Sequence, residues 1–150
     1  MDTAKAIDFI IVCLEQKKIF IKDILDITKQ IEVQSRQEKM EMDDLVTQRQ
    51  TRIDRLKKCD NLIDEKVKTL DKNQREKWEK LVVGKADGFD NDDEQKAFAL
   101  MLSTKEMLER INTLDNKAKE NLQEQYEEAK RQLAELRKNT SNSSDIFNFK

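Results

Sequence analysis

The residues of this chain that could take part in chemistry are its carboxylates and two cysteines. Thirty-one of the 150 residues are Asp or Glu, and histidine is absent. Without histidine, the common acid–base triads and most zinc and iron sites are unavailable. A catalytic carboxylate needs a sheltered pocket that shifts its pKa, whereas dispersed carboxylates are typical of solvated helix faces. A glycine-rich phosphate loop is also missing. We therefore expect a protein that is not an enzyme and that carries no cofactor.

The two cysteines, Cys13 and Cys59, are isolated in the sequence and have apolar neighbours. Their spacing matches no metal-binding or redox motif. We interpret them as core residues of a protein in a reducing compartment, and a regulatory disulfide is the alternative.

The acidic segment 84–93, GKADGFDNDD, contains both glycines of the chain. The cluster formed by Asp90, Asp92, Asp93 and Glu94 suits a helix N-terminus, where the helix dipole favours negative charge. A calcium loop is the alternative, but the EF-hand pattern needs acids at alternate positions and glycine at the sixth, and this order is missing. The segment therefore predicts a chain break followed by a helix, with no metal site.

The composition as a whole indicates helices. Charged residues make up 40% of the chain, which has two glycines and no proline. A β or α/β fold needs more turn residues than this. The mixed charges, with a formal net charge of −2, form no basic patch for nucleic acid. The longest apolar run near the start, residues 9–14, is too short to insert into a membrane, so we expect a cytoplasmic location.

Three long helices are predicted from apolar residues that recur at spacings of three and four. We expect them over about residues 3–33, 36–83 and 93–138, in one domain that covers residues 1–138. Ser35 and Glu38 fit a capping box for the second helix. Two alternatives are a later start at Asp43 and a first and second helix that are continuous but bent. Trp78 belongs to a short helical segment that we expect to cap one end of the bundle.

The third helix carries the longest apolar stripe, with a nearly unbroken heptad spacing. Ser103 and Glu106 fit a second capping box, so a short helix over 95–102 before the long one is an alternative. At about 35 residues, the long helix is expected to extend past its partners. Its stripe is either bundle core or, in its last part, a docking surface for a partner helix. The residues of this candidate docking surface are Leu122, Tyr126, Ala129, Leu133 and Leu136.

The C-terminal segment 139–150 begins with the polar run NTSNSSD and is predicted to be a flexible tail. It ends in apolar residues that are unusual for a frayed terminus. Ile146, Phe147 and Phe149 could instead dock onto the bundle or onto a partner. The fold class we predict is all-α: an antiparallel up-down-up bundle or coiled coil of three long helices with short helical connections and an extended C-terminal tail.

The pattern resembles the FlgN family of flagellar export chaperones over nearly the full length. The resemblance rests on the aliphatic stripe between residues 7 and 31, on an acidic–Leu step at 42–45, and on a polar linker followed by the apolar tail 144–150. The remaining matching positions, on the second and last helices, are Arg49, Gln50, Ile53, Leu56, Ile111, Leu114, Asn116, Asn121 and Leu122. The segment 84–93 departs from the family pattern.

The resemblance implies a cytoplasmic chaperone that binds hook-associated (filament-junction) proteins and delivers them to the flagellar type III export gate. In related export chaperones an aromatic residue on the last helix contacts the gate, and Tyr126 is the residue of that type here. The alternative from another class is a self-associating coiled-coil scaffold or adaptor, and a homodimer is compatible with either. We expect neither nucleic-acid binding nor membrane insertion.

Overall fold

The computed structural model describes residues 2–139, and the regular secondary structure within this range is all α-helix, with no strand. The all-α class is therefore confirmed for the described residues. Four helices follow one another along the chain: α1 (Thr3–Ser35), α2 (Asp43–Val67), α3 (Lys72–Val82) and α4 (Asp92–Asn139).

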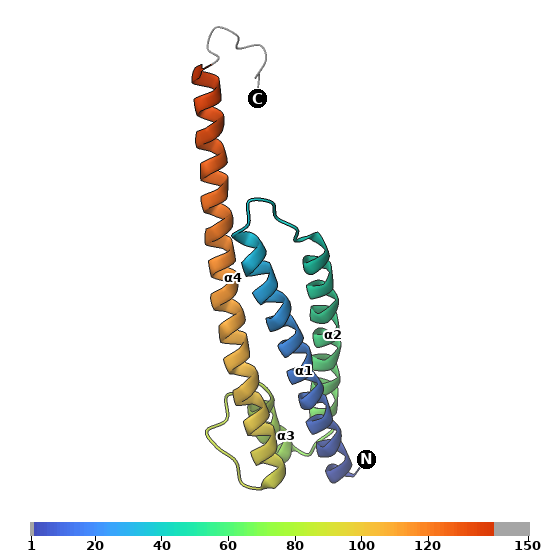
Figure 1. Ribbon diagram of the computed structural model, residues 1–150. Helices are drawn as coiled ribbons and strands as arrows, with labels where there is room; N and C mark the ends of the chain where they lie inside the picture. The colour runs from blue at the N-terminus through green and yellow to red at the C-terminus, as the bar shows by residue number, and fades with distance from the viewer. Residues whose placement is uncertain (1, 140–150) are drawn as a thin grey trace.

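The three long helices lie side by side, with α1 between α2 and α4 (Figure 1). The principal contacts are those of α1 with α4 and of α1 with α2. The chain direction reverses from α1 to α2, and α4 runs in the same direction as α1 (Figure 1). The short helix α3 lies at the end where α1 begins. The other end of α4 continues well past the loop that joins α1 to α2.

The central position of α1 explains its composition. A helix that packs on two neighbours needs a wide apolar face, and α1 buries aliphatic residues toward both. In the middle layer of the core, Ile21, Ile24 and Leu25 of α1 cluster with Ile111 of α4, and Ile53 of α2 packs against them. By contrast, α2 buries only Cys59, Ile63 and Val67, so most of its surface remains solvated.

The core is thickest at the end that contains α3. There Trp78 is completely buried among residues of α1, α2 and α4, including Ile10, Leu14 and Ala97. Both cysteines belong to this cluster, and both are free thiols. Their core location is as predicted. At the opposite end the core narrows to Ile27 and Ile31 of α1 with Ala118 of α4.

The prediction of one helix over 36–83 is wrong, because the chain breaks twice in this range. Ser35 is the last residue of α1 rather than the start of the next helix. Its buried hydroxyl donates a hydrogen bond to the Glu32 carbonyl oxygen (2.5 Å), and the hydroxyl oxygen accepts one from Asn121 Nδ2 rather than from the backbone of a following helix. The later start was the correct one: α2 begins at Asp43 and has two aspartates in its first turn, where the helix dipole favours them.

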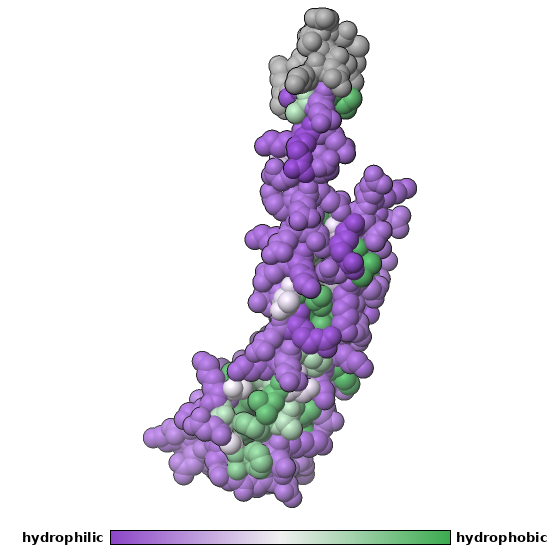
Figure 2. Space-filling model, turned by 60° about the vertical axis from the view of Figure 1, so that its left-hand side comes forward, coloured by the Kyte–Doolittle hydropathy of each residue, from purple (hydrophilic) through white to green (hydrophobic). Residues whose placement is uncertain are grey.

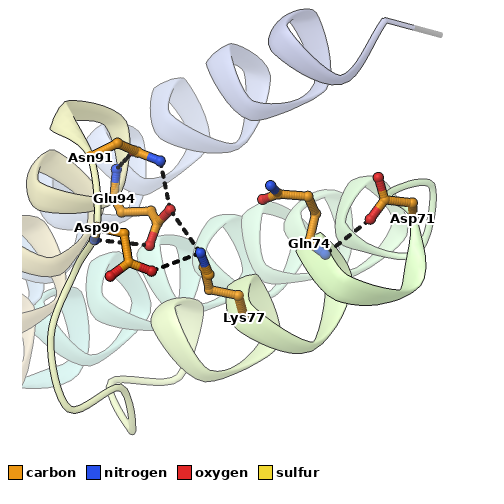
Figure 3. Close-up of polar contacts among 6 residues, drawn as sticks. All are labelled: Asp71, Gln74, Lys77, Asp90, Asn91 and Glu94. Atoms are coloured by element: carbon orange, nitrogen blue, oxygen red, sulfur yellow. Dashed lines mark hydrogen bonds and ion pairs between the residues drawn. The ribbon is translucent and has the colours of Figure 1, made fainter.

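The second break separates α2 from α3. Asp71 is the N-cap of α3, and its Oδ1 accepts a hydrogen bond from the Gln74 backbone N–H at 3.0 Å (Figure 3). This satisfies one of the amide groups that a helix start leaves without a partner. The spacing of Asp71 and Gln74, D-x-x-Q, is thus a signal in the sequence for the start of this helix.

The expected break at 84–93 is confirmed, and α4 begins at Asp92 with acidic residues in its first turn. The alternative of a capping box at Ser103 and Glu106, with a separate helix over 95–102, is wrong, and the single helix expected over 93–138 is present. One helix of 48 residues runs through this position without interruption. At 1.5 Å per residue it is about 72 Å long.

Candidate partner-binding surface

One face of α4 is buried along most of the helix. Ala97, Met101, Ile111 and Ala118 all point into the core that α4 shares with α1. The last two are seven residues apart, and so are Leu122, Ala129 and Leu136 further along. Residues that differ by seven lie on nearly the same side of a helix. The buried face therefore continues in the direction of the C-terminus.

The shared core ends where two amides of α4 bind the end of α1. Asn121 Nδ2 donates a hydrogen bond to Ser35 Oγ (2.9 Å). Gln125 Nε2 donates to two backbone carbonyl oxygens, those of Ser35 (2.7 Å) and Gln37 (2.9 Å). Carbonyl groups at a helix C-terminus lack partners within their own helix, and Gln125 supplies one. We call Asn121 and Gln125 the amide clamp.

Beyond the amide clamp, residues 126–139 of α4 project past the ends of both α1 and α2 (Figure 1). These 14 residues correspond to about 21 Å of helix. We call them the projecting segment. Tyr126 is 63% exposed there, Ala129 and Leu136 are also exposed, and Leu133 is half-buried.

The structure thus brings four of the five predicted client-binding residues together on the projecting segment. Tyr126, Ala129, Leu133 and Leu136 follow a 3,4 spacing and so share one side of the helix. The fifth, Leu122, is half-buried beside the amide clamp, at the edge of the core. The candidate docking residues of the tail, Ile146, Phe147 and Phe149, lie outside the described residues.

The opposite side of the projecting segment is charged. Arg131 donates hydrogen bonds to Glu128 from Nε (3.1 Å) and from Nη2 (2.5 Å). These bonds lower the pKa of the Glu128 carboxyl, and both residues are exposed. Ion pairs of this kind contribute little to stability, but they identify the solvated side of the helix. The segment is therefore amphipathic, as a helix that docks on a partner should be.

The contacts that fix the base of this segment were not predicted from the sequence. In addition to the amide clamp, Arg49 of α2 forms a bidentate ion pair with Asp115 of α4, at 2.6 and 2.8 Å. The hydrogen bond to Asp115 raises the pKa of the Arg49 guanidinium. The pair joins residues 66 positions apart, and nothing in the local sequence of either residue indicates its partner.

The two cysteine thiols are held in the core. The Cys59 thiol donates a hydrogen bond to the Cys13 carbonyl oxygen (3.0 Å) within the core. Burial raises the pKa of both thiols, and that of Cys59 reaches about 11. Reactive cysteines show the opposite shift. Within residues 2–139 there is no group of three or more Cys, Asp or Glu side chains placed to hold a metal ion.

A comparison of the chain with models of known protein families, with curated proteins and with solved structures found no match. Separately, none of the four described helices combines the length and the apolarity that crossing a bilayer requires.

Proposed function

We propose that this protein is a non-catalytic, cytoplasmic chaperone of the flagellar type III export system. In this proposal it binds hook-associated proteins through α4 and delivers them to the export gate. The observation that carries the binding role is the projecting segment, in which an apolar helix face continues past the ends of α1 and α2. The flagellar assignment comes from the sequence resemblance to the FlgN family.

The proposed client is an amphipathic helix from an otherwise disordered end of the exported protein. It would lay its apolar stripe along Leu122, Ala129, Leu133 and Leu136, in the manner of a coiled coil. The helices α1, α2 and α4 serve as an up-down-up bundle that holds this surface ready. Because the client must fold as it binds, part of the interaction energy is consumed in ordering it. The net affinity is then modest, which allows the client to be released for export.

Tyr126 is the proposed contact with the export gate. It lies at the base of the projecting segment, 63% exposed and one turn beyond Leu122. An exposed tyrosine offers a rigid apolar ring and a hydroxyl that can stay hydrated, which suits an interface anchor. A residue at the edge of the client surface could contact the gate while a client is bound.

The test is a charge placed on the apolar side of the projecting segment. Leu133→Glu should weaken binding of a hook-associated protein at least about tenfold, because a carboxylate would be buried against the apolar stripe of the client. The matched control is Ala134→Glu, which adds the same charge one residue away, at an exposed position off the stripe. Both variants should keep their helical circular dichroism. Equal client binding by the two variants would exclude this surface.

The alternative function is a self-associating scaffold or adaptor. It is favoured by the same apolar side of the projecting segment, because two copies of this side could pack against each other. Light scattering, which gives the size of the assembly, and circular dichroism, which gives its helicity, distinguish the chaperone from the scaffold. A chaperone should be a monomer or a compact dimer that gains helicity with a client peptide. A long oligomer that Leu133→Glu dissociates would support the scaffold instead.

A further inference from the structure

A second apolar surface lies at the other end of the molecule, where α3 meets the first turns of α4. Figure 2 shows hydrophobic side chains gathered there within an otherwise polar surface. Phe89 precedes α4 and is 46% exposed, and Leu102 on α4 is 50% exposed. The rings of Phe89 and Phe98 are in contact, with centroids 5.7 Å apart, and Leu102 lies one helical turn from Phe98. We call Phe89, Phe98 and Leu102 the basal patch.

The basal patch is held in place by a network of polar contacts directly after Phe89. Glu94, only 2% exposed, accepts hydrogen bonds from the Asp90 backbone N–H (3.3 Å) and from Asn91 Nδ2 (2.7 Å). Asn91 Oδ1 in turn accepts from the Glu94 backbone N–H at 2.9 Å, so the two residues cap α4 reciprocally. Figure 3 shows these contacts.

Lys77 of α3 ties this network to the neighbouring helix. Its Nζ lies 2.9 Å from Asp90 Oδ2 and 3.4 Å from Glu94 Oε2 (Figure 3). The hydrogen bond to Asp90 raises the pKa of the Lys77 ammonium. Phe89 is therefore displayed on a backbone that is fixed from both α3 and α4. A surface that does not have to be ordered on binding retains more of its interaction energy.

The chain around the basal patch is strongly acidic. Residues 84–93 contain four aspartates and one lysine, which gives a formal charge of −3. Asp87, Asp92 and Asp93 are exposed, and among the described residues only Asp90 of the four pairs with a cation. Such a rim repels nucleic acid and anionic lipid, and it attracts cationic protein segments.

We infer that the basal patch binds a basic segment of a partner protein, in which an apolar anchor side chain is flanked by lysine or arginine. The anchor would pack on Phe89, Phe98 and Leu102, and the cations would face the exposed aspartates. This surface is distinct from the projecting segment: Leu102 and Leu133 are 31 positions apart on α4, which corresponds to about 47 Å. The inference does not depend on the flagellar role.

The test uses a synthetic amphipathic peptide of lysine and leucine with one phenylalanine, compared with the same peptide in which every lysine is glutamate. Trp78, the only tryptophan, is buried in the cluster against which Phe98 packs, so its fluorescence reports occupancy of the basal patch. We expect saturable, salt-sensitive binding of the basic peptide and none of the acidic one. Equal binding of the two peptides would overturn the inference.

Two variants localise the binding. Phe89→Ser removes an exposed ring and should weaken binding of the basic peptide about tenfold, as loss of an aromatic anchor does. The matched control is Val46→Ser at an exposed position of α2, which should bind like the unchanged protein. Leu133→Glu should also bind normally.

If Leu133→Glu abolishes binding while Phe89→Ser does not, the peptide occupies the projecting segment and the basal patch is not the site. Self-association that Phe89→Ser removes would identify a second copy as the occupant and likewise overturn the inference.

Discussion

At the scale of single residues, a few polar side chains decide how the helices are joined. Arg49 and Asp115 connect α2 to α4, and Gln125 holds the end of α1. The core position of Cys13 and Cys59 could be predicted, because isolated thiols among apolar neighbours are usually buried. The partners of Arg49 and Gln125 could not be predicted, because charged and amide side chains are abundant and a bond across 66 or 90 positions leaves no local pattern.

The buried thiols make stability depend on pH in the alkaline range. Burial raises the pKa of Cys59 from 9.0 to about 11, so the folded state holds this proton more tightly than the unfolded chain does. The resulting contribution is complete below pH 9 and is lost as pH rises toward 11. Between pH 8 and pH 10 we expect the free energy of unfolding to fall by about 1 kcal/mol more in the unchanged protein than in Cys59→Ala.

Urea unfolding at the two pH values measures this difference. The comparison with Cys59→Ala cancels the titration of the lysines, which both proteins share. If the free energy of unfolding falls equally in both proteins between pH 8 and pH 10, folding does not raise the pKa of Cys59.

At the scale of elements, the helices were predictable but several of their ends were not. The absence of proline and the 3,4 spacing indicate long helices, and the aspartate cluster correctly indicated the start of α4. Two Ser-x-x-Glu patterns were misleading. Ser103 lies in the interior of α4, and Ser35 ends α1 with its hydroxyl bonded back to the preceding turn. The pair that does cap α4, Asn91 and Glu94, has the same spacing with asparagine in place of serine.

The turn after α3 provides a test of backbone conformation at this scale. Gly84 has φ +72°, a left-handed conformation that disfavours side chains, whereas no such φ occurs at Gly88. Neither position has a neighbour within 4 Å that an added Cβ would meet. Gly84→Ala should therefore lower the free energy of unfolding by about 1 kcal/mol through backbone strain alone.

Gly88→Ala is the matched control and should change stability by no more than about 0.5 kcal/mol in either direction. Thermal or denaturant unfolding of the two variants gives the comparison. A loss at Gly88 as large as that at Gly84 would show that the strain argument does not explain the turn.

At the scale of the whole molecule, two apolar surfaces lie at opposite ends of one long helix. That α4 would extend past its partners could be predicted from the length of its stripe. The point where the projecting segment begins could not be predicted, because it depends on where α1 ends, and the sequence between 34 and 44 offered several starts for the next helix. The basal patch also escaped prediction, because Phe89 belongs to a loop and Phe98 to a helix, so no single periodicity connects them.

This arrangement predicts that the projecting segment can be removed without unfolding the rest. A chain that ends after Gln125 retains the amide clamp, the Arg49–Asp115 pair and all the buried core clusters. Its melting temperature should stay within a few degrees of that of the full chain, since a few degrees correspond to about 1 kcal/mol. Client binding should be lost. Calorimetry and a pull-down measure the two properties, and a cooperative unfolding transition that disappears on truncation would contradict the prediction.

The position of α1 between α2 and α4 also favours one order of folding. Contacts of α1 with α2 join residues such as Cys13 and Cys59, 46 positions apart, whereas the amide clamp closes loops of 86 and 90 positions. Closing a longer loop costs more chain entropy, and during synthesis α4 is the last helix to emerge. We therefore expect the hairpin of α1 and α2 to form before α4 packs on it, with one apolar side of α1 uncovered until then. During that interval the nascent chain exposes an apolar helix face. The folded protein is proposed to cover a face of the same kind on its clients.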